Sequence, residues 1–362
     1  KQYWINESIK SSKDIFKLIF FQDEYHYCNE RFAFINKFNI NTIYSCVPKV
    51  SLKNIYGRNT IAKALHESLT GYVDDSLVDS ANAIRKPFSK RTVDIGYRAR
   101  PLPYYNGRGA QEKTQIGEKF IDTMRGSDLT LDVKMGEEDR IYGKDWHRFI
   151  ANCKGMLGVE AGTSIFDIDG TAEQKCNDYL LKRPSASFEE VYKAVLAPYE
   201  DKIFYRTISP RVFECAAFKT CMILFEGKYN DILEPNVHYI PLKKDFSNIE
   251  AVLNTFNDED KRVKIVENAY RDLIESQKYS YKSFIKDFDN KISSTLDISL
   301  SKYPRKNEIY KLINKDKFYR ILIIRLKLYI IKIYLLVPFR KFIFWPFKLL
   351  INLFKKTNSR VM

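Results

Sequence analysis

The sequence predicts an α/β protein built on a doubly wound parallel sheet. Short apolar runs alternate with longer amphipathic stretches from about residue 90 to about residue 230, and strands that alternate with helices form parallel sheets. No repeat with a period of about 20 to 50 residues is visible, which argues against solenoids and propellers. The chain has 362 residues, of which 45% are hydrophobic, so it is long enough for two domains with appendages.

Seven segments carry this alternation, in the order strand, helix, strand, helix, strand, helix, strand. They are residues 91–97, 111–124, 129–133, 146–153, 155–159, 210–218 and 221–225. Upstream, residues 15–21 and 42–46 have the apolar character of strands and indicate the end of an earlier α/β layer. Downstream, residues 249–253, 260–277 and 279–292 indicate helices rich in charge.

The net charge of +15 is concentrated at the C-terminus. Residues 302–362 contain 16 lysine and arginine residues and two acidic residues, so they carry +14 and the remaining 301 residues carry only +1. A nearly neutral body argues against a nucleic-acid-binding protein and indicates a separate partner for the tail.

The tail pattern indicates helices that lie in a membrane surface. No apolar run approaches the 18 to 20 residues, roughly, that span a bilayer, and at about 100° per residue the basic side chains gather on one side of each helical stretch. Pro338 and Pro346 interrupt a single long helix. We therefore predict that residues 317–356 bind an anionic membrane surface; packing against the protein itself or a partner is the alternative.

The cysteines indicate buried thiols in a cytosolic protein. They are Cys28, Cys46, Cys153, Cys176, Cys215 and Cys221. They form no C-x-x-C pair and have no histidines at metal-ligand spacing, so we expect no metal site. The chain begins at Lys1 without the features of a secretory signal, and we interpret this start as a truncation.

Residues suited to an anionic ligand follow the predicted strands or begin the predicted helix at residues 210–218. They are Arg98, Arg100, Glu160, Gly162, Ser164, Ser209, Arg211, Glu226 and Gly227. Ligands of a parallel sheet bind at the carboxyl ends of its strands, and arginines, a Gly-Thr-Ser turn and a helix start with Pro210 in its first turn suit a phosphate group. Helix capping and surface arginines are the alternative explanation for each of them taken alone.

The order of features over residues 90–290 is similar to a known family. A strand ending in arginine is followed by Lys113 on the next helix, Gly158-Val-Glu160-Ala-Gly162-Thr-Ser164, Arg211-Val-Phe-Glu214-Cys-Ala-Ala-Phe, and Asp245-Phe-Ser-Asn248 before a helical tail. This order resembles the C-terminal half of GT-B glycosyltransferases, especially the group-one transferases and the spore-protein-like branch.

The resemblance implies a role for several residues. Glu214 matches the glutamate that contacts the nucleotide ribose, while Arg98 or Arg100 and Lys113 match the basic residues that neutralise the donor diphosphate. A carboxylate suits paired hydroxyls, and cations stabilise charge on a diphosphate leaving group. Retaining members often carry a second glutamate, but Arg206 stands there. Donor binding therefore carries over better than a catalytic mechanism, and retention or inversion stays open.

The resemblance also implies an organisation and an activity. It makes residues 1–85 the remainder of an acceptor-side α/β domain, residues 86–300 the nucleotide-sugar-binding domain, and residues 301–362 the membrane-associating tail. The expected enzyme is a hexosyltransferase without a cofactor that moves a sugar from a nucleotide-sugar to a glycan or lipid-linked acceptor, for example in lipopolysaccharide or other surface-polysaccharide synthesis. It would act at the inner face of the cell membrane.

Two further residue groups keep other interpretations open. His26 follows the first strand and is a candidate acceptor-side base. Asp167 and Asp169, in Phe166-Asp-Ile-Asp-Gly-Thr, resemble the nucleophile motif of haloacid-dehalogenase-type, Mg²⁺-dependent phosphatases. A loop with Asp and Gly at turn positions is the simpler interpretation. A non-catalytic membrane scaffold is the third possible class.

Overall fold

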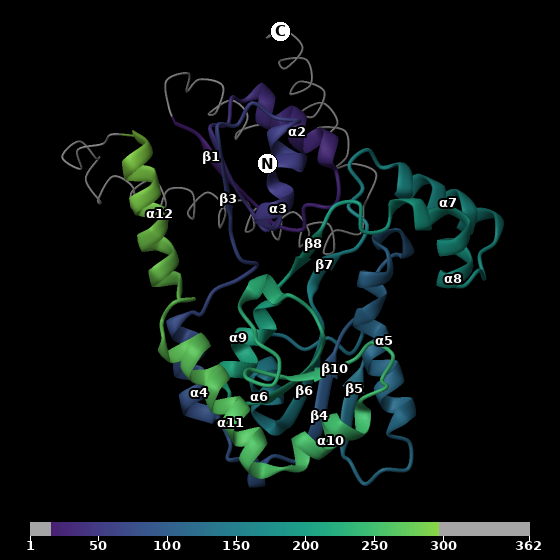
Figure 1. Ribbon diagram of the computed structural model, residues 1–362, viewed down its shortest axis with the longest axis vertical. Helices are drawn as coiled ribbons and strands as arrows, with labels where there is room; N and C mark the ends of the chain where they lie inside the picture. Colours follow the sequence, from purple (N-terminus) through teal and green to yellow (C-terminus); the bar gives the residue numbers. More distant parts are fainter. Residues whose placement is uncertain (1–15, 297–362) are drawn as a thin grey trace, which may run out of the picture. The chain divides into compact units, whose positions relative to one another are not determined.

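The computed structural model describes residues 16–296, which belong to one compact unit, Lys1–Leu296 (Figure 1). Its largest sheet has the strand order β10-β9-β6-β4-β5, and all neighbouring strands are parallel. The strands are β4 (Val93–Arg98), β5 (Leu131–Lys134), β6 (Cys153–Gly158), β9 (Cys221–Phe225) and β10 (Ile240–Leu242). This confirms the predicted doubly wound parallel sheet.

Helices cover both faces of this sheet. On one face lie α4 (Asp75–Ile84), α6 (Gly143–Asn152) and α9 (Pro210–Ala217), and on the other lie α5 (Arg108–Thr123) and α10 (Ile249–Asn257). The helix α11 (Glu259–Tyr270) contributes side chains to both cores. Successive residues of β9 alternate between two apolar cores, with Met222 and Leu224 in the first and Ile223 and Phe225 in the second. A strand that is buried on both sides must be apolar throughout, as β9 is.

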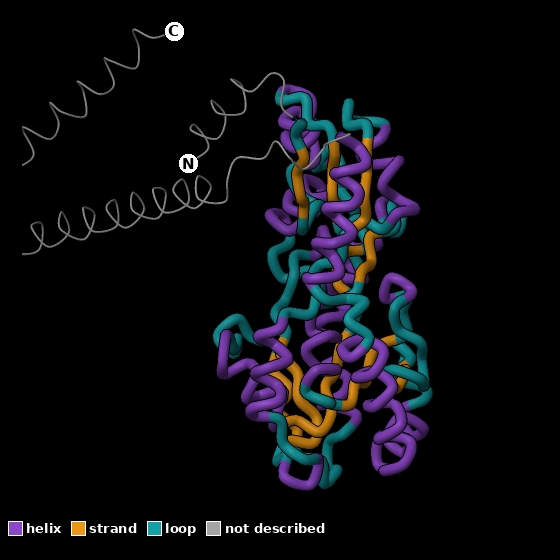
Figure 2. Tube along the Cα trace, turned by 90° about the vertical axis from the view of Figure 1, so that its left-hand side faces the viewer, coloured by secondary structure: helices purple, strands orange, loops and turns teal. Residues whose placement is uncertain are grey.

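A smaller parallel sheet is formed by the N-terminal part of the described chain. Its order is β1 (Leu18–Phe21), β2 (Thr42–Ser45) and β3 (Ala64–Glu67). The helices α2 (Cys28–Lys37) and α3 (Lys49–Leu52) and the π-helix η1 (Lys53–Gly57) share an apolar core with it. Phe284 and Phe288 of α12 (Tyr281–Leu296) contact the ring of Phe20. Figure 2 shows the two sheets as separate groups of strands with helices beside them.

The segment between β6 and α9 contains an insertion that the sequence patterns missed. A short antiparallel ribbon of β7 (Ala161–Thr163) and β8 (Tyr205–Thr207) encloses four helical elements with a small core of their own. These are α7 (Thr171–Lys182), α8 (Phe188–Val191), η4 (Tyr192–Leu196) and η5 (Ala197–Tyr199). The remaining short elements are η2 (Phe88–Lys90), η3 (Tyr104–Asn106), η6 (Tyr229–Asp231) and η7 (Arg271–Glu275).

The Asp-Ile-Asp motif lies in this insertion as a loop. The Oδ2 of Asp167 accepts a hydrogen bond from the backbone N–H of Glu173 at 2.8 Å, and the Oδ1 of Asp169 accepts one from that of Thr171 at 3.0 Å. The carboxylates thus cap the first turn of α7. The loop interpretation is confirmed, and the strand that a phosphatase nucleophile requires is not formed at this position.

Other expectations concern the cysteines and the tail. All six cysteines are free and buried, as expected. No helix within residues 16–296 is long and apolar enough to span a bilayer. The predicted membrane-binding segment, residues 317–356, lies outside the described residues.

Candidate functional site

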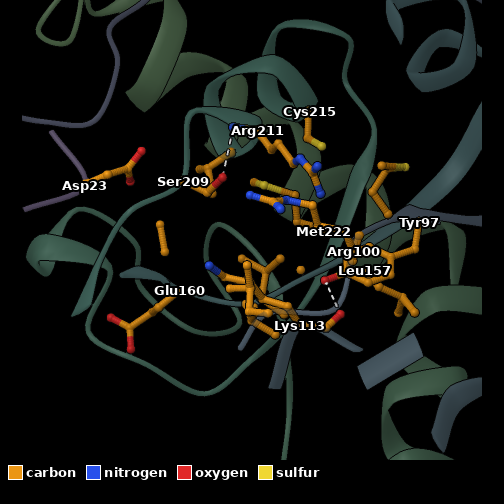
Figure 3. A pocket seen from close by; sticks show the side chains of 18 of the residues that line it. Asp23, Tyr97, Arg100, Lys113, Leu157, Glu160, Ser209, Arg211, Cys215 and Met222 are labelled. Carbon is orange, nitrogen blue, oxygen red and sulfur yellow. Dashed lines mark hydrogen bonds between the residues drawn. The ribbon is translucent and has the colours of Figure 1, made fainter. Parts of the chain in front are cut away.

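The carboxyl-terminal edge of the large sheet borders a cavity of about 290 Å³. Segments after β1, β4 and β6 line it, together with α5 and the amino end of α9. Its polar lining includes Asp23, Tyr25, Arg100, Lys113, Glu160, Ser209 and Arg211. Figure 3 shows Arg100, Lys113 and Arg211 around one hollow, with Asp23 and Glu160 toward its other side. The fold therefore gathers five of the predicted donor-binding residues, from Arg100 to Arg211, in one place.

Lys113 is a half-buried cation in this cavity. Among the described residues its ammonium group has no carboxylate within 4.0 Å and no hydrogen-bond acceptor. Burial, joined by the guanidinium groups of Arg211 and Arg100 and opposed by Asp23, lowers the pKa of Lys113 to about 8. An ammonium that loses water without gaining a counterion is destabilised, and a bound anion would reverse that effect.

Arg211 is held by the start of α9. Ser209 is the N-cap of this helix, and its Oγ accepts a hydrogen bond from the backbone N–H of Arg211 at 3.4 Å. The guanidinium group of Arg211 donates to the carbonyl oxygen of Arg98 and lies over the ring of Trp146, 5.1 Å from its centroid. These contacts leave the guanidinium group charged and without a carboxylate partner among the described residues.

Glu160 organises the loop that follows β9. Its Oε1 accepts hydrogen bonds from the backbone N–H groups of Lys228 at 3.1 Å and Tyr229 at 2.9 Å. A Cβ atom on Gly227 would lie 2.7 Å from the Glu160 carboxyl carbon, so a side chain at this position would have to displace the end of Glu160. Burial raises the pKa of Glu160, against the hydrogen bonds and Arg206. Glu226 itself is exposed, and neither it nor Gly227 lines the cavity.

A second cavity of about 390 Å³ adjoins the first. The two cavities share Ala99, Arg100, Ser209 and Arg211. The second is further lined by aromatic and acidic residues, namely Tyr142, Trp146 and Glu214. The Trp146 Nε1–H donates to the Oε2 of Glu214 at 2.7 Å, and Tyr142 is exposed with the Arg140 guanidinium over its ring. The sequence analysis named neither Tyr142 nor Trp146 as a site residue, because each lies beside a helix start without a recognisable motif.

Arg98 lies beneath this region rather than in the first cavity. Its Nη2 forms an ion pair with the Oδ1 of Asp132 at 2.8 Å, and its guanidinium group lies 4.3 Å from the centroid of the Phe149 ring. The side chain is buried, and its Nη1 donates to two backbone carbonyl groups. Of the two arginines proposed for the diphosphate, the exposed Arg100 is therefore the better placed.

Gly162 lies in β7, and Ser164 follows this strand and contacts the first turn of α5. Gly162 has φ +89°, and a Cβ atom there would lie 2.2 Å from the carbonyl oxygen of Tyr205. The Oγ of Ser164 accepts a hydrogen bond from the backbone N–H of Gly109 at 2.8 Å, so it caps α5. Neither residue lines the cavities described above.

Arg206 stands where the resemblance suggested a glutamate. It forms an ion pair with Glu112 at 3.3 Å, and its guanidinium group lies against the backbone at Gly109. Lys244 contacts the same carboxylate at 2.7 Å. This ion-paired cluster lies beside Lys113 and adds positive charge to its surroundings.

Two residues after β1 are candidates for the acceptor side. His26 lies against the rings of Tyr25 and Tyr105, with centroids 4.3 and 5.9 Å away, and does not line the cavity. Burial lowers its pKa, so the imidazole is neutral at pH 7. Asp23, which the sequence analysis did not single out, is exposed, lines the cavity and has φ 54°. A non-glycine residue with positive φ is uncommon and worth testing at a functional site.

The arrangement suits binding of a large anion. Arg100, with only a distant carboxylate partner, and Arg211, with none among the described residues, line both cavities. Lys113 lines the first cavity, Tyr142 and Glu214 line the second, and Asp23 and Glu160 line the first. Within residues 16–296 no group of three or more His, Cys, Asp or Glu side chains is placed to hold a metal ion.

No protein-family model and no curated protein matches the chain. Among solved structures, TarM matches 79% of this chain and 52% of its own length, with 13% identity and a TM-score of 0.43. Anabaena HepE in complex with UDP-glucose matches 81% of this chain and 77% of its own length, with 10% identity and a TM-score of 0.46. Sucrose-phosphate synthase from Thermosynechococcus elongatus matches 82% of this chain and 72% of its own length, with 8% identity and a TM-score of 0.44. The chain thus spans about half the length of TarM.

Proposed function

We propose that the chain is a glycosyltransferase of the GT-B type that takes a sugar from a nucleoside-diphosphate donor. The observation that carries this proposal is the set of Arg100, Lys113 and Arg211 at the carboxyl edge of a parallel sheet, where Lys113 and Arg211 have no carboxylate partner within the described part of the chain. Arg100 has only a distant one, Glu137 at 3.9 Å. A diphosphate supplies the missing negative charge, and guanidinium groups bind it in pairs of hydrogen bonds.

The second cavity suits the nucleoside. The exposed ring of Tyr142 offers aromatic surface for a base. The Oε2 of Glu214 accepts from Trp146, while its Oε1 makes no hydrogen bond within residues 16–296 and is available to ribose hydroxyls. Arg211 lies between the two cavities, as a diphosphate lies between nucleoside and sugar.

The first cavity then receives the sugar. Glu160 and Asp23 present carboxylates there, and carboxylates accept hydrogen bonds from sugar hydroxyls. When the bond between sugar and diphosphate breaks, negative charge develops on the diphosphate. Fixed cations at that position stabilise the transition state more than the ground state.

The acceptor and the location follow from the tail. We propose a glycan or lipid-linked acceptor at the cytoplasmic face of the membrane, in surface-polysaccharide synthesis. The basic composition of residues 317–356 supports this, because attachment to an anionic surface raises the enzyme concentration near a lipid-linked substrate. The hexosyl specificity and the spore-protein-like branch stay predictions.

Thermal-shift measurements against a panel of nucleoside diphosphates test the proposal. At least one should raise the melting temperature of the full chain, and Lys113→Gln and Arg211→Gln should each abolish most of that increase. Lys119→Gln, on an exposed turn of the same helix, should leave it unchanged. If no nucleoside diphosphate shifts the melting temperature, or if the two site variants respond like Lys119→Gln, the donor site is wrong and a non-catalytic role is favoured.

A further inference from the structure

A separate cavity of about 340 Å³ lies at the opposite edge of the large sheet. It is bordered by residues just before or at the starts of β4, β6 and β9, for example Arg91, Lys154 and Cys221, and by the first turns of α11. Because these strands are parallel, their amino ends lie at the edge away from the donor cavities. Nothing in the proposed transfer reaction uses this position.

The lining of this cavity is strongly basic. Its cations are Arg85, Lys86, Arg91, Lys154, Lys219 and Arg262, and its carboxylates are Glu259 and Glu267. Two of the lysines are neutralised, because Lys154 pairs with Asp94 at 2.6 Å and Lys219 with Glu267 at 2.5 Å. Among the described lining residues the other four cations face a single remaining carboxylate, Glu259, so this part of the chain gives the cavity a positive excess.

Arg262 is the most informative of these four. Its side chain is 6% exposed, and its guanidinium group lies 3.7 Å from the centroid of the Phe88 ring. The Nη1 donates to the carbonyl oxygen of Phe256 at 2.5 Å. Within residues 16–296 its Nε and Nη2 make no hydrogen bond, and no carboxylate lies within 4.0 Å. Neither nitrogen is among the fully buried polar atoms without a partner in the described residues, so both are open to the cavity and available to an anion.

Arg91 adds a second buried charge beside it. It is 5% exposed, and its donors reach the carbonyl groups of Lys86, Cys153 and Phe218 and the hydroxyl group of Thr220. These hydrogen bonds satisfy its N–H groups but supply no negative charge, and burial lowers the pKa of Arg91 to about 10. Two buried guanidinium groups without a counterion among the described residues thus border one cavity.

We propose that this cavity binds a soluble phosphate-bearing organic anion, with Arg262 as its main hydrogen-bonding partner. A guanidinium group with two unused donors matches two phosphate oxygens, and the exposed Lys86 lies at the rim to attract the anion. Phe88, Val263 and Val266 provide apolar surface for an organic group. The guanidinium groups are recessed, which favours a soluble ligand over a headgroup held in a flat membrane surface.

Calorimetric titration with inorganic pyrophosphate separates this site from the donor site. In the full chain with Lys113→Gln and Arg211→Gln, pyrophosphate should still bind at about one molecule per chain. Adding Arg262→Gln should weaken that binding at least tenfold, as expected for loss of charge-assisted hydrogen bonds. Arg148→Gln, a change at an exposed arginine paired with Asp145 on α6, should leave it unchanged.

A second variant keeps the test valid if Arg262→Gln unfolds the protein. Within residues 16–296 the exposed Lys86 ammonium group donates one hydrogen bond, to Asn152 Oδ1 at 2.7 Å, so Lys86→Gln should leave the fold intact and weaken pyrophosphate binding several-fold. The proposal is overturned if the Lys113→Gln/Arg211→Gln chain binds no pyrophosphate, or if Lys86→Gln and Arg262→Gln bind it as tightly as Arg148→Gln. It is also overturned if Arg262 affects binding to phosphatidic acid vesicles but not to pyrophosphate.

Discussion

The indole Nε1–H of Trp146 donates a hydrogen bond to the Oε2 of Glu214 at 2.7 Å, which joins α6 to α9. The indole ring is 9% exposed and lies beneath the guanidinium group of Arg211. One contact therefore orients the carboxylate assigned to the ribose and supports the cation assigned to the diphosphate. Trp146 therefore contacts both the proposed ribose-binding residue and the proposed diphosphate-binding residue.

Trp146→Phe should weaken donor binding without removing the aromatic surface. The phenyl ring keeps most of the packing but loses the N–H, so the free energy of unfolding should fall by about 1–2 kcal/mol. The KM for the donor should rise, and kcat should change little. Urea denaturation and steady-state kinetics measure the two effects separately.

Glu214→Gln should give the complementary result. The amide oxygen still accepts from Trp146, so stability should be nearly unchanged, while the lost charge should raise the donor KM about tenfold. Glu118→Gln, at an exposed carboxylate on α5, is the matched control. A Glu214→Gln enzyme with the donor KM of Glu118→Gln would contradict the ribose assignment.

Lys113 should make donor affinity depend on pH. Its pKa of about 8 lies below the ordinary value of 10.5, so the ammonium group is charged below pH 8 and becomes neutral above it. Donor affinity should therefore fall as the pH rises from 7 to 9. The contribution of Lys113 to the free energy of unfolding should change in the opposite direction, because from pH 8 to about 10.5 the unfolded chain binds more protons than the folded one.

The Lys113→Arg variant tests this origin of the pH dependence. A guanidinium group stays charged throughout the range, so donor affinity measured by calorimetry should become nearly constant between pH 7 and 9. Retention of the original pH profile in Lys113→Arg would assign the titration to another group.

Four strands of the large sheet were predictable because short apolar runs alternate with amphipathic helices, whereas the three-residue edge strand β10 was not predicted. Residues 221–225 were predicted as a strand and form β9 with the same bounds. The insertion between Gly162 and Tyr205 was missed, because the ribbon strands have only three residues each and depend on long-range pairing. Strands this short carry too few residues for an alternation pattern.

The candidate site was predictable only in part, for a related reason. Arg100 and Glu160 were selected because they follow strands, and Arg211 because it begins a helix; all three line the same cavity, since parallel strands deliver their last residues to one edge. The direction in which a side chain points at that edge was not predictable. Arg98, two residues from Arg100, has its side chain buried against Asp132 and Phe149, which the local sequence does not indicate.

Gly227→Ala should disturb the loop after β9 through steric contact alone. The added methyl group would lie 2.7 Å from the Glu160 carboxyl carbon, and displacing that carboxylate weakens its hydrogen bonds to Lys228 and Tyr229. Overpacking of this kind costs about 1–3 kcal/mol. Glu226→Ala, at the exposed neighbouring residue, should cost under about 0.5 kcal/mol. Equal melting temperatures for the two variants would mean that the loop accommodates the methyl group.

Asp23 and His26 can be distinguished as acceptor-side bases by kinetics. Asp23 lines the cavity that also contains Lys113 and Arg100, whereas His26 does not line it and packs against Tyr25 and Tyr105. A base must reach the acceptor hydroxyl directly or through one water, so the geometry favours Asp23. Asp23→Asn should therefore lower kcat by about 100-fold with little change in the donor KM, and His26→Gln should lower it much less.

Single-turnover rates with saturating donor separate this chemical step from product release. A larger loss in His26→Gln than in Asp23→Asn would instead support the histidine, whose lowered pKa keeps it neutral and able to accept a proton at pH 7. If neither change affects the rate, the segment after β1 supplies no base. Glu160, the other carboxylate lining the cavity, would then be the next candidate to test as a base.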